Sequence, residues 1–143
     1  MPFKSLILVV LQFTAMFYLI IEGPLFFFNF WLLCYAFGIF IALWGIFSVG
    51  LFNFNIQPEV KSNTLIQDGV YRWIRNPMYS GILIFFIPVT IQEVSLIKTF
   101  FYGLLLLVFI LKVHREEFFL LEKFGEEYRR YKAKTSRFIP YII

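Results

Sequence analysis

Residues 30–52 read FWLLCYAFGIFIALWGIFSVGLF and carry no charged side chain. A helix that crosses a bilayer needs about 20 predominantly apolar residues, so this stretch predicts a transmembrane helix. Three other apolar runs lie on either side of it, at residues 5–21, 78–92 and 96–113. The sequence therefore predicts an all-α fold, in which residues 1–143 form one integral membrane domain with four transmembrane helices.

The composition excludes a soluble domain. Of the 143 residues, 60% are hydrophobic and 15% are charged, and the mean hydropathy is +0.77. Soluble domains are about 45–50% apolar and about 25% charged, so lipid must cover the excess apolar surface of this chain. The chain has 13 basic and 9 acidic side chains. In a membrane protein this excess belongs to loops that face anionic lipid, and we expect membrane lipids rather than nucleic acid as partners.

The basic residues predict how the chain is oriented, because short loops keep Lys and Arg on the cytoplasmic side. Four transmembrane helices place both termini on one side, and Lys98 is then the only one of the 13 basic residues on the other side. We therefore expect a multi-pass protein with both termini in the cytoplasm. The small size and the absence of a targeting sequence favour the inner membrane of a prokaryote.

Two polar segments carry nearly all of the charge, namely the loop 55–77 and residues 114–134 after the last apolar run. In the four-helix topology both segments emerge at the cytoplasmic face, so they can meet although they are far apart in sequence. Polar chemistry is expected there. The apolar residues of the second segment recur at helical spacing, which predicts an amphipathic C-terminal helix that continues or follows the last apolar run, with a bend at Gly125.

A helix start ends the loop, in the sequence DGVYRWIRNPMYSG at residues 68–81. Asn76 is a favoured N-cap and Pro77 a favoured first helical residue, so the free N–H groups of this helix can bind a carboxylate or a phosphate. Tyr79 offers a hydroxyl or a ring face, and Gly81 lets a ligand or another backbone approach. A capped helix with an interfacial tyrosine and nearby arginines is also common in membrane proteins without such a site.

Two adjacent carboxylates follow the last apolar run. Glu117 falls on the apolar stripe of the predicted helix, where a carboxylate needs a partner. It therefore either binds a cation or ligand, or pairs with Arg72 or Arg75. Glu116 lies one turn from Lys112, which favours a surface ion pair.

No metal site is predicted. His114 is the only histidine and Cys34 the only cysteine, which excludes an intrachain disulfide and a zinc cluster of the usual ligands. His114 stands at the expected membrane boundary, where an interfacial role is more common than a catalytic one. The sequence contains no motif for nucleotide hydrolysis, acyl hydrolysis or metalloproteolysis.

Two motifs together resemble a known family. The sequences GVYRWIRNPMYSG at 69–81 and EEFFLLEKFGEEYRRY at 116–131, followed by RFIP at 137–140, are similar to motifs of the isoprenylcysteine carboxyl methyltransferase and phospholipid methyltransferase families. The likeness covers about residues 65–143. These families are integral membrane enzymes that use S-adenosylmethionine, so the resemblance implies this cofactor and a lipophilic methyl acceptor.

The resemblance also implies roles for single residues. The predicted cofactor-binding residues lie in the two motifs or just before the second one, and are Tyr71, Asn76, Pro77, Tyr79, Gly81, His114, Glu116 and Glu117. Arg75 and Glu117 are the predicted catalytic residues, and Arg75 and Arg137 the predicted contacts of an anionic acceptor. The family often has histidine where Asn76 stands; asparagine keeps the cap but cannot be protonated.

The chemistry of S-adenosylmethionine suits such a site. Its carboxylate favours a helix N-terminus, its ammonium a carboxylate, and its sulfonium an aromatic face. Methyl transfer from an activated sulfonium needs alignment and exclusion of water more than acid–base catalysis. The acceptor remains open among an isoprenylcysteine-like carboxylate, a phospholipid amine and another hydrophobic small molecule.

Two other functions stay open. The sequence RFIPY at 137–141 also resembles the ends of membrane sterol reductases, which use NADPH. Four helices, however, leave little room for both a sterol and a dinucleotide. A non-enzymatic scaffold with a basic, lipid-binding tail explains the Lys and Arg residues but not a carboxylate on the apolar stripe.

Overall fold

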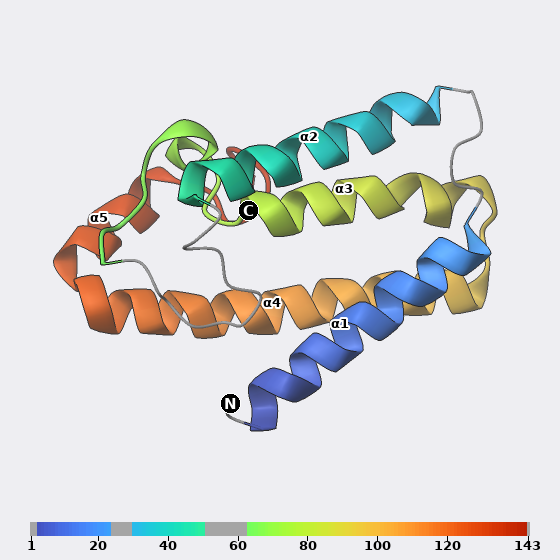
Figure 1. The fold of residues 1–143 in the computed structure, drawn as a ribbon, viewed down its shortest axis with the longest axis horizontal. Coiled ribbons are helices and arrows are strands. Elements are labelled where there is room, and N and C mark those ends of the chain that lie inside the picture. Colours follow the sequence, from blue (N-terminus) through green and yellow to red (C-terminus); the bar gives the residue numbers. More distant parts are fainter. Residues whose placement is uncertain (1–2, 24–29, 51–62, 143) are drawn as a thin grey trace.

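The computed structural model describes residues 3–23, 30–50 and 63–142, and helices dominate these ranges (Figure 1). The elements are α1 (Phe3–Glu22), α2 (Trp31–Val49), the 3-10 helix η1 (Gly69–Arg72), α3 (Pro77–Gln92), α4 (Leu96–Phe124) and α5 (Glu126–Lys134). Three of them, α1, α2 and α4, are long and apolar enough to cross a membrane. The apolar helix α3 has only 16 residues. The predicted all-helical membrane protein is confirmed, whereas the fourth span stays a prediction.

The helices α1 and α4 pack against each other in antiparallel directions. Gln12 of α1 contacts Lys112 of α4, and six residues later Tyr18 stacks on Phe101, with the ring centroids 4.1 Å apart. The residue number thus rises along α1 as it falls along α4. The N-terminal end of α1 therefore lies toward the same end of the bundle as the C-terminal end of α4 (Figure 1).

The helices α2 and α3 form a second antiparallel pair, which lies side by side in Figure 1. Glycines allow their backbones to approach: Gly38 of α2 faces Gly81 of α3, and Gly45 of α2 faces Pro77. In a membrane, helices associate through such close packing because lipid tails are as apolar as their side chains. The pairing places the first turn of α3 beside the last turns of α2.

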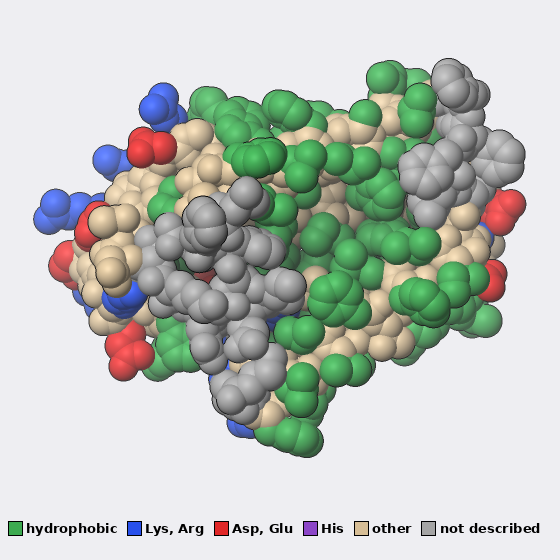
Figure 2. Space-filling model, viewed as in Figure 1, with side chains coloured by type: hydrophobic (Ala, Val, Ile, Leu, Met, Phe, Trp, Pro, Cys, Tyr) green, Lys and Arg blue, Asp and Glu red, His purple; other side chains and the backbone are tan. Residues whose placement is uncertain are grey.

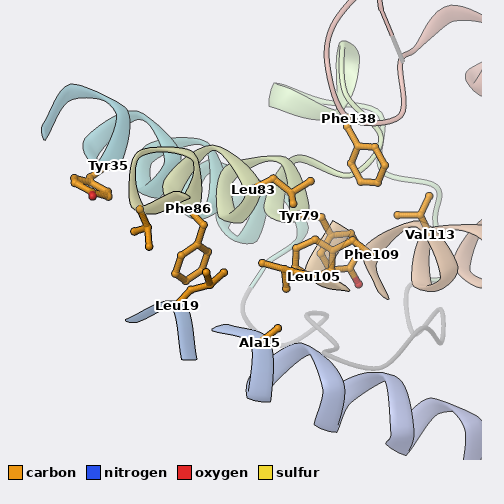
Figure 3. Close-up of a cluster of buried hydrophobic side chains, with 11 residues drawn as sticks. Ala15, Leu19, Tyr35, Tyr79, Leu83, Phe86, Leu105, Phe109, Val113 and Phe138 are labelled. Carbon is orange, nitrogen blue, oxygen red and sulfur yellow. The ribbon is translucent and has the colours of Figure 1, made fainter. Parts of the chain in front are cut away.

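One cluster of buried apolar side chains joins the two helix pairs (Figure 3). It contains Ala15 and Leu19 of α1, Tyr35 of α2, Tyr79, Leu83, Phe86 and Val89 of α3, Leu105, Phe109 and Val113 of α4, and Phe138 from the segment after α5. Many other large apolar side chains on α1, α2 and α4 are exposed, as expected where lipid takes the place of a protein partner.

The two polar segments meet at one end of the bundle. Ile74 and Ser136 form a parallel β-bridge, in which the Arg75 N–H donates to the Ser136 carbonyl at 2.8 Å and the Ser136 N–H donates to the Trp73 carbonyl at 3.0 Å. Charged side chains gather at this end, around α5, while hydrophobic side chains cover the middle of the molecule (Figure 2). The expectation that the loop and the C-terminal segment meet is confirmed for these residues.

The last apolar run and the segment after it share one helix. The helix that begins at Leu96 continues past Val113 to Phe124, and no Gly or Pro lies between these two residues. Gly125, with φ +52°, then separates α4 from α5, which confirms the predicted bend. The segment 114–134 is thus the end of α4 followed by a short helix. Residues 55–62 of the predicted cytoplasmic loop lie outside the described residues.

Candidate functional site

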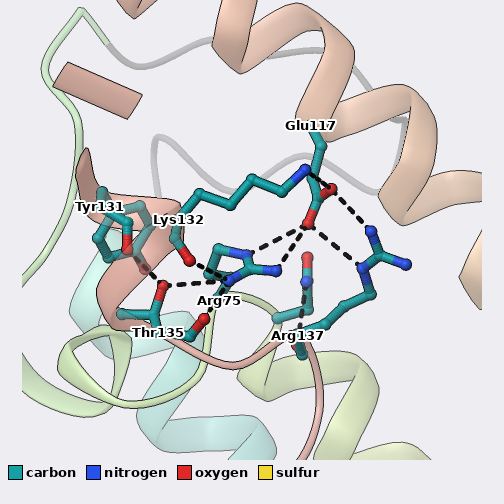
Figure 4. Close-up of polar contacts among 7 residues, drawn as sticks. Arg75, Glu117, Tyr131, Lys132, Thr135 and Arg137 are labelled. Atoms are coloured by element: carbon teal, nitrogen blue, oxygen red, sulfur yellow. Dashed lines mark hydrogen bonds and ion pairs between the residues drawn. The ribbon is translucent and has the colours of Figure 1, made fainter. Parts of the chain in front are cut away.

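Glu117 is the centre of an ionic cluster at the polar end of the bundle (Figure 4). Its carboxylate accepts hydrogen bonds from Arg75 Nε at 3.2 Å, Lys132 Nζ at 3.0 Å and Arg137 Nη2 at 2.9 Å. The side chain of Glu117 is 7% exposed, while those of Lys132 and Arg137 are 48% and 31% exposed. Of the two alternatives for Glu117, the structure shows the ion pair with Arg75, extended by two further cations.

Arg75 also holds the segment that follows α5. Besides Glu117, its guanidinium donates to the carbonyl oxygen of Lys132 at 3.1 Å, to the hydroxyl of Thr135 at 3.3 Å and to the Thr135 carbonyl. Its side chain is only 9% exposed. Arg75 therefore ties the loop before α3 to α4 and to the C-terminal segment, and little of it is left to meet a substrate.

Asn76 occupies the N-cap position of α3 but does not cap the helix with its side chain. Its amide nitrogen instead donates to the carbonyl oxygen of Arg137 at 3.1 Å, which corrects the predicted side-chain cap. One turn on, the Ser80 hydroxyl donates to the Phe138 carbonyl at 2.7 Å. Pro77 is buried against Gly45 of α2. The start of α3 is thus covered by α2 on one side and by residues 137–138 on another.

Tyr79 and Glu116 meet between α3 and α4. The Tyr79 hydroxyl donates to Glu116 Oε1 at 2.6 Å, and its ring stacks on Phe109, with the centroids 4.7 Å apart. The Lys112 ammonium lies 5.5 Å from the centre of the same ring. The predicted surface ion pair of Glu116 is therefore not what the structure shows. Glu116 is half-buried, and its carboxylate is turned toward α3.

Two tyrosines, one on η1 and one on α5, join the loop before α3 to the C-terminal segment. The Tyr131 hydroxyl of α5 donates to the Tyr71 carbonyl of η1 at 2.8 Å. Burial, followed by the negative charge of Glu116, raises the pKa of Tyr71 above its usual range. Tyr71 thus remains a neutral phenol at physiological pH, close enough to Glu116 to respond to its charge.

The remaining predicted residues lie apart from these contacts. A Cβ atom on Gly81 would stand 2.5 Å from the Gly38 carbonyl, so Gly81 is a packing position between α2 and α3. His114 is exposed on α4. Among the described residues no three His, Cys, Asp or Glu side chains are placed to hold a metal ion.

Sequence reasoning missed several members of the site. Lys132 bonds to Glu117, and Thr135 accepts a hydrogen bond from Arg75. Gln12 of α1 accepts a hydrogen bond from Lys112 at 2.7 Å. The pair of Gln12 and Lys112 could have been expected from the sequence. Gln12 is a polar residue inside an apolar run, and a buried amide needs a partner.

The comparisons with known proteins point to methyl transfer. A family model described as phospholipid methyltransferase matches residues 28–127. A probable protein-S-isoprenylcysteine O-methyltransferase of rice (Oryza sativa subsp. indica) is 39% identical over 79 residues, which cover 54% of this chain and 41% of the relative. The protein-S-isoprenylcysteine O-methyltransferase of fission yeast (Schizosaccharomyces pombe) is 30% identical, over 57% of this chain and 35% of the relative. That of Homo sapiens is 33% identical, over 64% of this chain and 33% of the relative. The chain thus matches well under half the length of these relatives.

Proposed function

This chain belongs to the phospholipid methyltransferase family, and on that premise we propose that it transfers a methyl group from S-adenosylmethionine to a lipophilic acceptor. The names of its relatives support a methyltransferase that acts on a lipophilic substrate. We propose further that the reaction takes place at the cytoplasmic face, where the two polar segments meet.

The observation that carries this proposal is the contact between Tyr79 and Glu116. The Glu117 charge is already compensated by Arg75, Lys132 and Arg137, so Glu117 is poorly suited to act as a base. Glu116 is held by a tyrosine hydroxyl on the adjacent helix. In our proposal Glu116 therefore binds the cofactor ammonium, and Glu117 maintains the shape of the site.

Aromatic side chains fit the rest of the cofactor. The Tyr79 ring lies between α3 and α4, and Tyr71 stands on the loop side of Glu116. When bound, S-adenosylmethionine supplies a methyl group on a cationic sulfur, and a tyrosine face attracts such a cation. The task left to the chain is to orient donor and acceptor and to exclude water.

Cations at the edge of the cluster suit an anionic group. Arg137 and Lys132 each bond to Glu117 but keep part of their side chains exposed, so we assign them to the cofactor carboxylate or to an anionic acceptor. Arg75, which is nearly buried, acts in this proposal by positioning Arg137 and Glu117. Asn76 and Pro77 contribute by fixing the start of α3 against residues 137–138.

The topology that we propose has four spans, with α3 as the short fourth span and both termini in the cytoplasm. It is supported by the antiparallel pairs α1–α4 and α2–α3 and by the charged side chains at one end. Reporter fusions after residue 143 and within residues 55–62 should report the same compartment. The relatives named above are eukaryotic, so the prokaryotic inner membrane stays a prediction.

The proposal is tested by ligand binding to the purified protein in detergent. S-adenosylhomocysteine should raise the melting temperature, because a ligand of the folded state stabilises it, and NADPH should not. Glu116→Gln should weaken binding at least about tenfold, since hydrogen bonds to charged groups contribute about 1.5–3 kcal/mol. Glu122→Gln, an exposed change on the same helix, is the matched control and should bind normally.

The acceptor is sought by incubating the protein with methyl-labelled cofactor and a total lipid extract. Label should move into the lipid fraction with the wild type and much more slowly with Glu116→Gln. Stabilisation by NADPH in place of S-adenosylhomocysteine would favour the reductase alternative. Absence of both cofactor binding and label transfer would overturn the proposal.

A further inference from the structure

Lys112 is fully buried in α4 although it stands near the polar end of the apolar run. A lysine in that position can extend its ammonium to the membrane surface at little cost. Here the side chain instead points into the bundle, where its ammonium bonds to α1 and lies over a ring of α3. An ionisable group kept inside a membrane bundle is expected to have a function, because burying its charge costs free energy.

The contacts of Lys112 join α1, α3 and α4 to one another. Its ammonium donates to Gln12 Oε1 of α1 at 2.7 Å and lies 5.5 Å from the centre of the Tyr79 ring of α3. On α4 itself, Glu116 follows one turn later, and the charges of the two side chains interact. Phe109, Lys112 and Glu116 lie on one face of α4, and all three act on Tyr79.

Gln12 brings α1 into this arrangement. It is buried, and its amide oxygen accepts the hydrogen bond that fixes the direction of the Lys112 side chain. The match to the family model begins at residue 28, so nothing in that match assigns a role to α1. Lys112, which bonds to Gln12, also lies over the Tyr79 ring, and the Tyr79 hydroxyl bonds to the carboxylate that we assign to the cofactor.

We propose that Lys112 is a positioning residue for Glu116, and that Gln12 makes α1 part of the cofactor site. The charge of Lys112 favours the ionised form of the Glu116 carboxylate, and its position beside Tyr79 keeps this carboxylate directed to that ring, ready to accept the cofactor ammonium. Gln12 holds the Lys112 ammonium on the side of α4 that faces α1. The Glu116 carboxylate then remains directed toward Tyr79 of α3. This inference rests on the proposed function, because it assumes that Glu116 binds the cofactor.

Burial raises the pKa of Glu116 to about 7; the Tyr79 hydrogen bond and the charge of Lys112 oppose this rise, and the charge of Glu117 adds to it. Lys112 and Glu117 lie on α4 itself, Tyr79 faces it from α3, and Tyr71 from η1. From α1 comes Gln12, which is uncharged and acts through Lys112. Lys112 is thus the cation whose charge lowers the pKa of Glu116, and its removal should make the carboxylate easier to protonate.

The test measures the affinity for S-adenosylhomocysteine as a function of pH, in the full-length protein in detergent. With Lys112→Met, the pH below which binding is lost should rise by about one unit or more, because an adjacent opposite charge lowers a carboxyl pKa by about one to three units. Gln12→Leu should shift the profile in the same direction by a smaller amount. Lys98→Met is the matched control: Lys98 is also buried on α4 but pairs with Glu93 at the other end of the helix, and its profile should match the wild type.

The outcomes separate this inference from the function on which it rests. A wild-type protein that does not bind S-adenosylhomocysteine contradicts the proposed function. A wild-type protein that binds, together with Lys112→Met and Gln12→Leu profiles that superimpose on its own, overturns the positioning role, even if both variants melt at lower temperature. If Lys112→Met does not fold, the Gln12→Leu profile decides alone.

Discussion

The backbones of Gly38 in α2 and Gly81 in α3 are so close that a Cβ atom on Gly81 would stand 2.5 Å from the Gly38 carbonyl oxygen. The same Cβ would meet the Ala42 backbone nitrogen at 2.6 Å. Neither contact can be relieved by a side-chain rotation, because both neighbours are backbone atoms. The two helices keep this separation only while residue 81 is glycine.

Gly81→Ala should therefore lower the free energy of unfolding by about 1–3 kcal/mol, the usual cost of forcing an extra group into a packed interface. Thermal unfolding in detergent measures this change. Gly103→Ala is the control, because a Cβ there meets nothing within 4 Å, and a helical Ala is favoured over Gly. A stable Gly81→Ala variant would show that α2 and α3 pack more loosely than described.

Glu117→Gln should destabilise the protein by about 3 kcal/mol, because it leaves the buried Arg75 without its carboxylate. The variant should also release the segment after α5, since Lys132 and Arg137 lose the same partner. Limited proteolysis and thermal unfolding report the two effects. Glu126→Gln breaks only the exposed pair with Arg129 and should change stability by less than about 1 kcal/mol.

Removal of the phenolic hydroxyl should affect the stability of the protein differently at Tyr128 and at Tyr131. The buried Tyr128 hydroxyl has no hydrogen-bond partner among the described residues, so Tyr128→Phe should leave stability unchanged or raise it by up to about 1–3 kcal/mol. Tyr131→Phe loses the bond to the Tyr71 carbonyl and should cost about 0.5–1.5 kcal/mol. Equal melting temperatures for the two variants would contradict this difference.

Alkaline pH should unfold the polar end of the protein. Burial raises the pKa of Tyr71, Tyr128 and Tyr131 above the usual value of 10.0. Between the usual pKa and the raised one, the unfolded chain has released protons that the folded chain still holds. Stability is therefore complete below about pH 10 and falls as the pH rises further.

Melting temperatures measured from about pH 9 to about pH 11 test this expectation, together with the absorbance of the phenolate form. Tyr131→Phe should make the fall of the melting temperature with pH shallower, because one of the three raised groups is removed. A slope that is the same in the wild type and in this variant would exclude Tyr131 as a contributor.

The helices themselves could be predicted because they depend on local sequence. Apolar runs bounded by polar residues gave α1 and α2 to within a few residues, and Pro77 and Gly125 mark helix ends that the structure shares. Whether the C-terminal helix continues the last apolar run or follows it was left open by the sequence, and the structure shows one continuous helix, α4. A helix ends where its backbone is broken, and the sequence offers no break before Gly125.

The contacts of the site depended on packing between helices and were harder to predict. From α4 alone, Glu116 resembles a surface residue, since its partner Tyr79 lies on another helix. Asn76 fits a cap by residue type, but the segment after α5 offers its side chain a carbonyl instead. The pairing of Glu117 with Arg75 was one of two alternatives, and only the approach of the two polar segments selects it. The roles of these residues in binding and catalysis remain predictions.

Residues 132–138, which hold Arg75, Asn76 and Ser80 in place, come after α1 to α4 in the sequence. A ribosome makes them after α1 to α4, so the polar end cannot close while those helices are still entering the membrane. A chain that stops before residue 132 would keep α1 to α4 but lack the contacts that hold Arg75, Asn76 and Ser80.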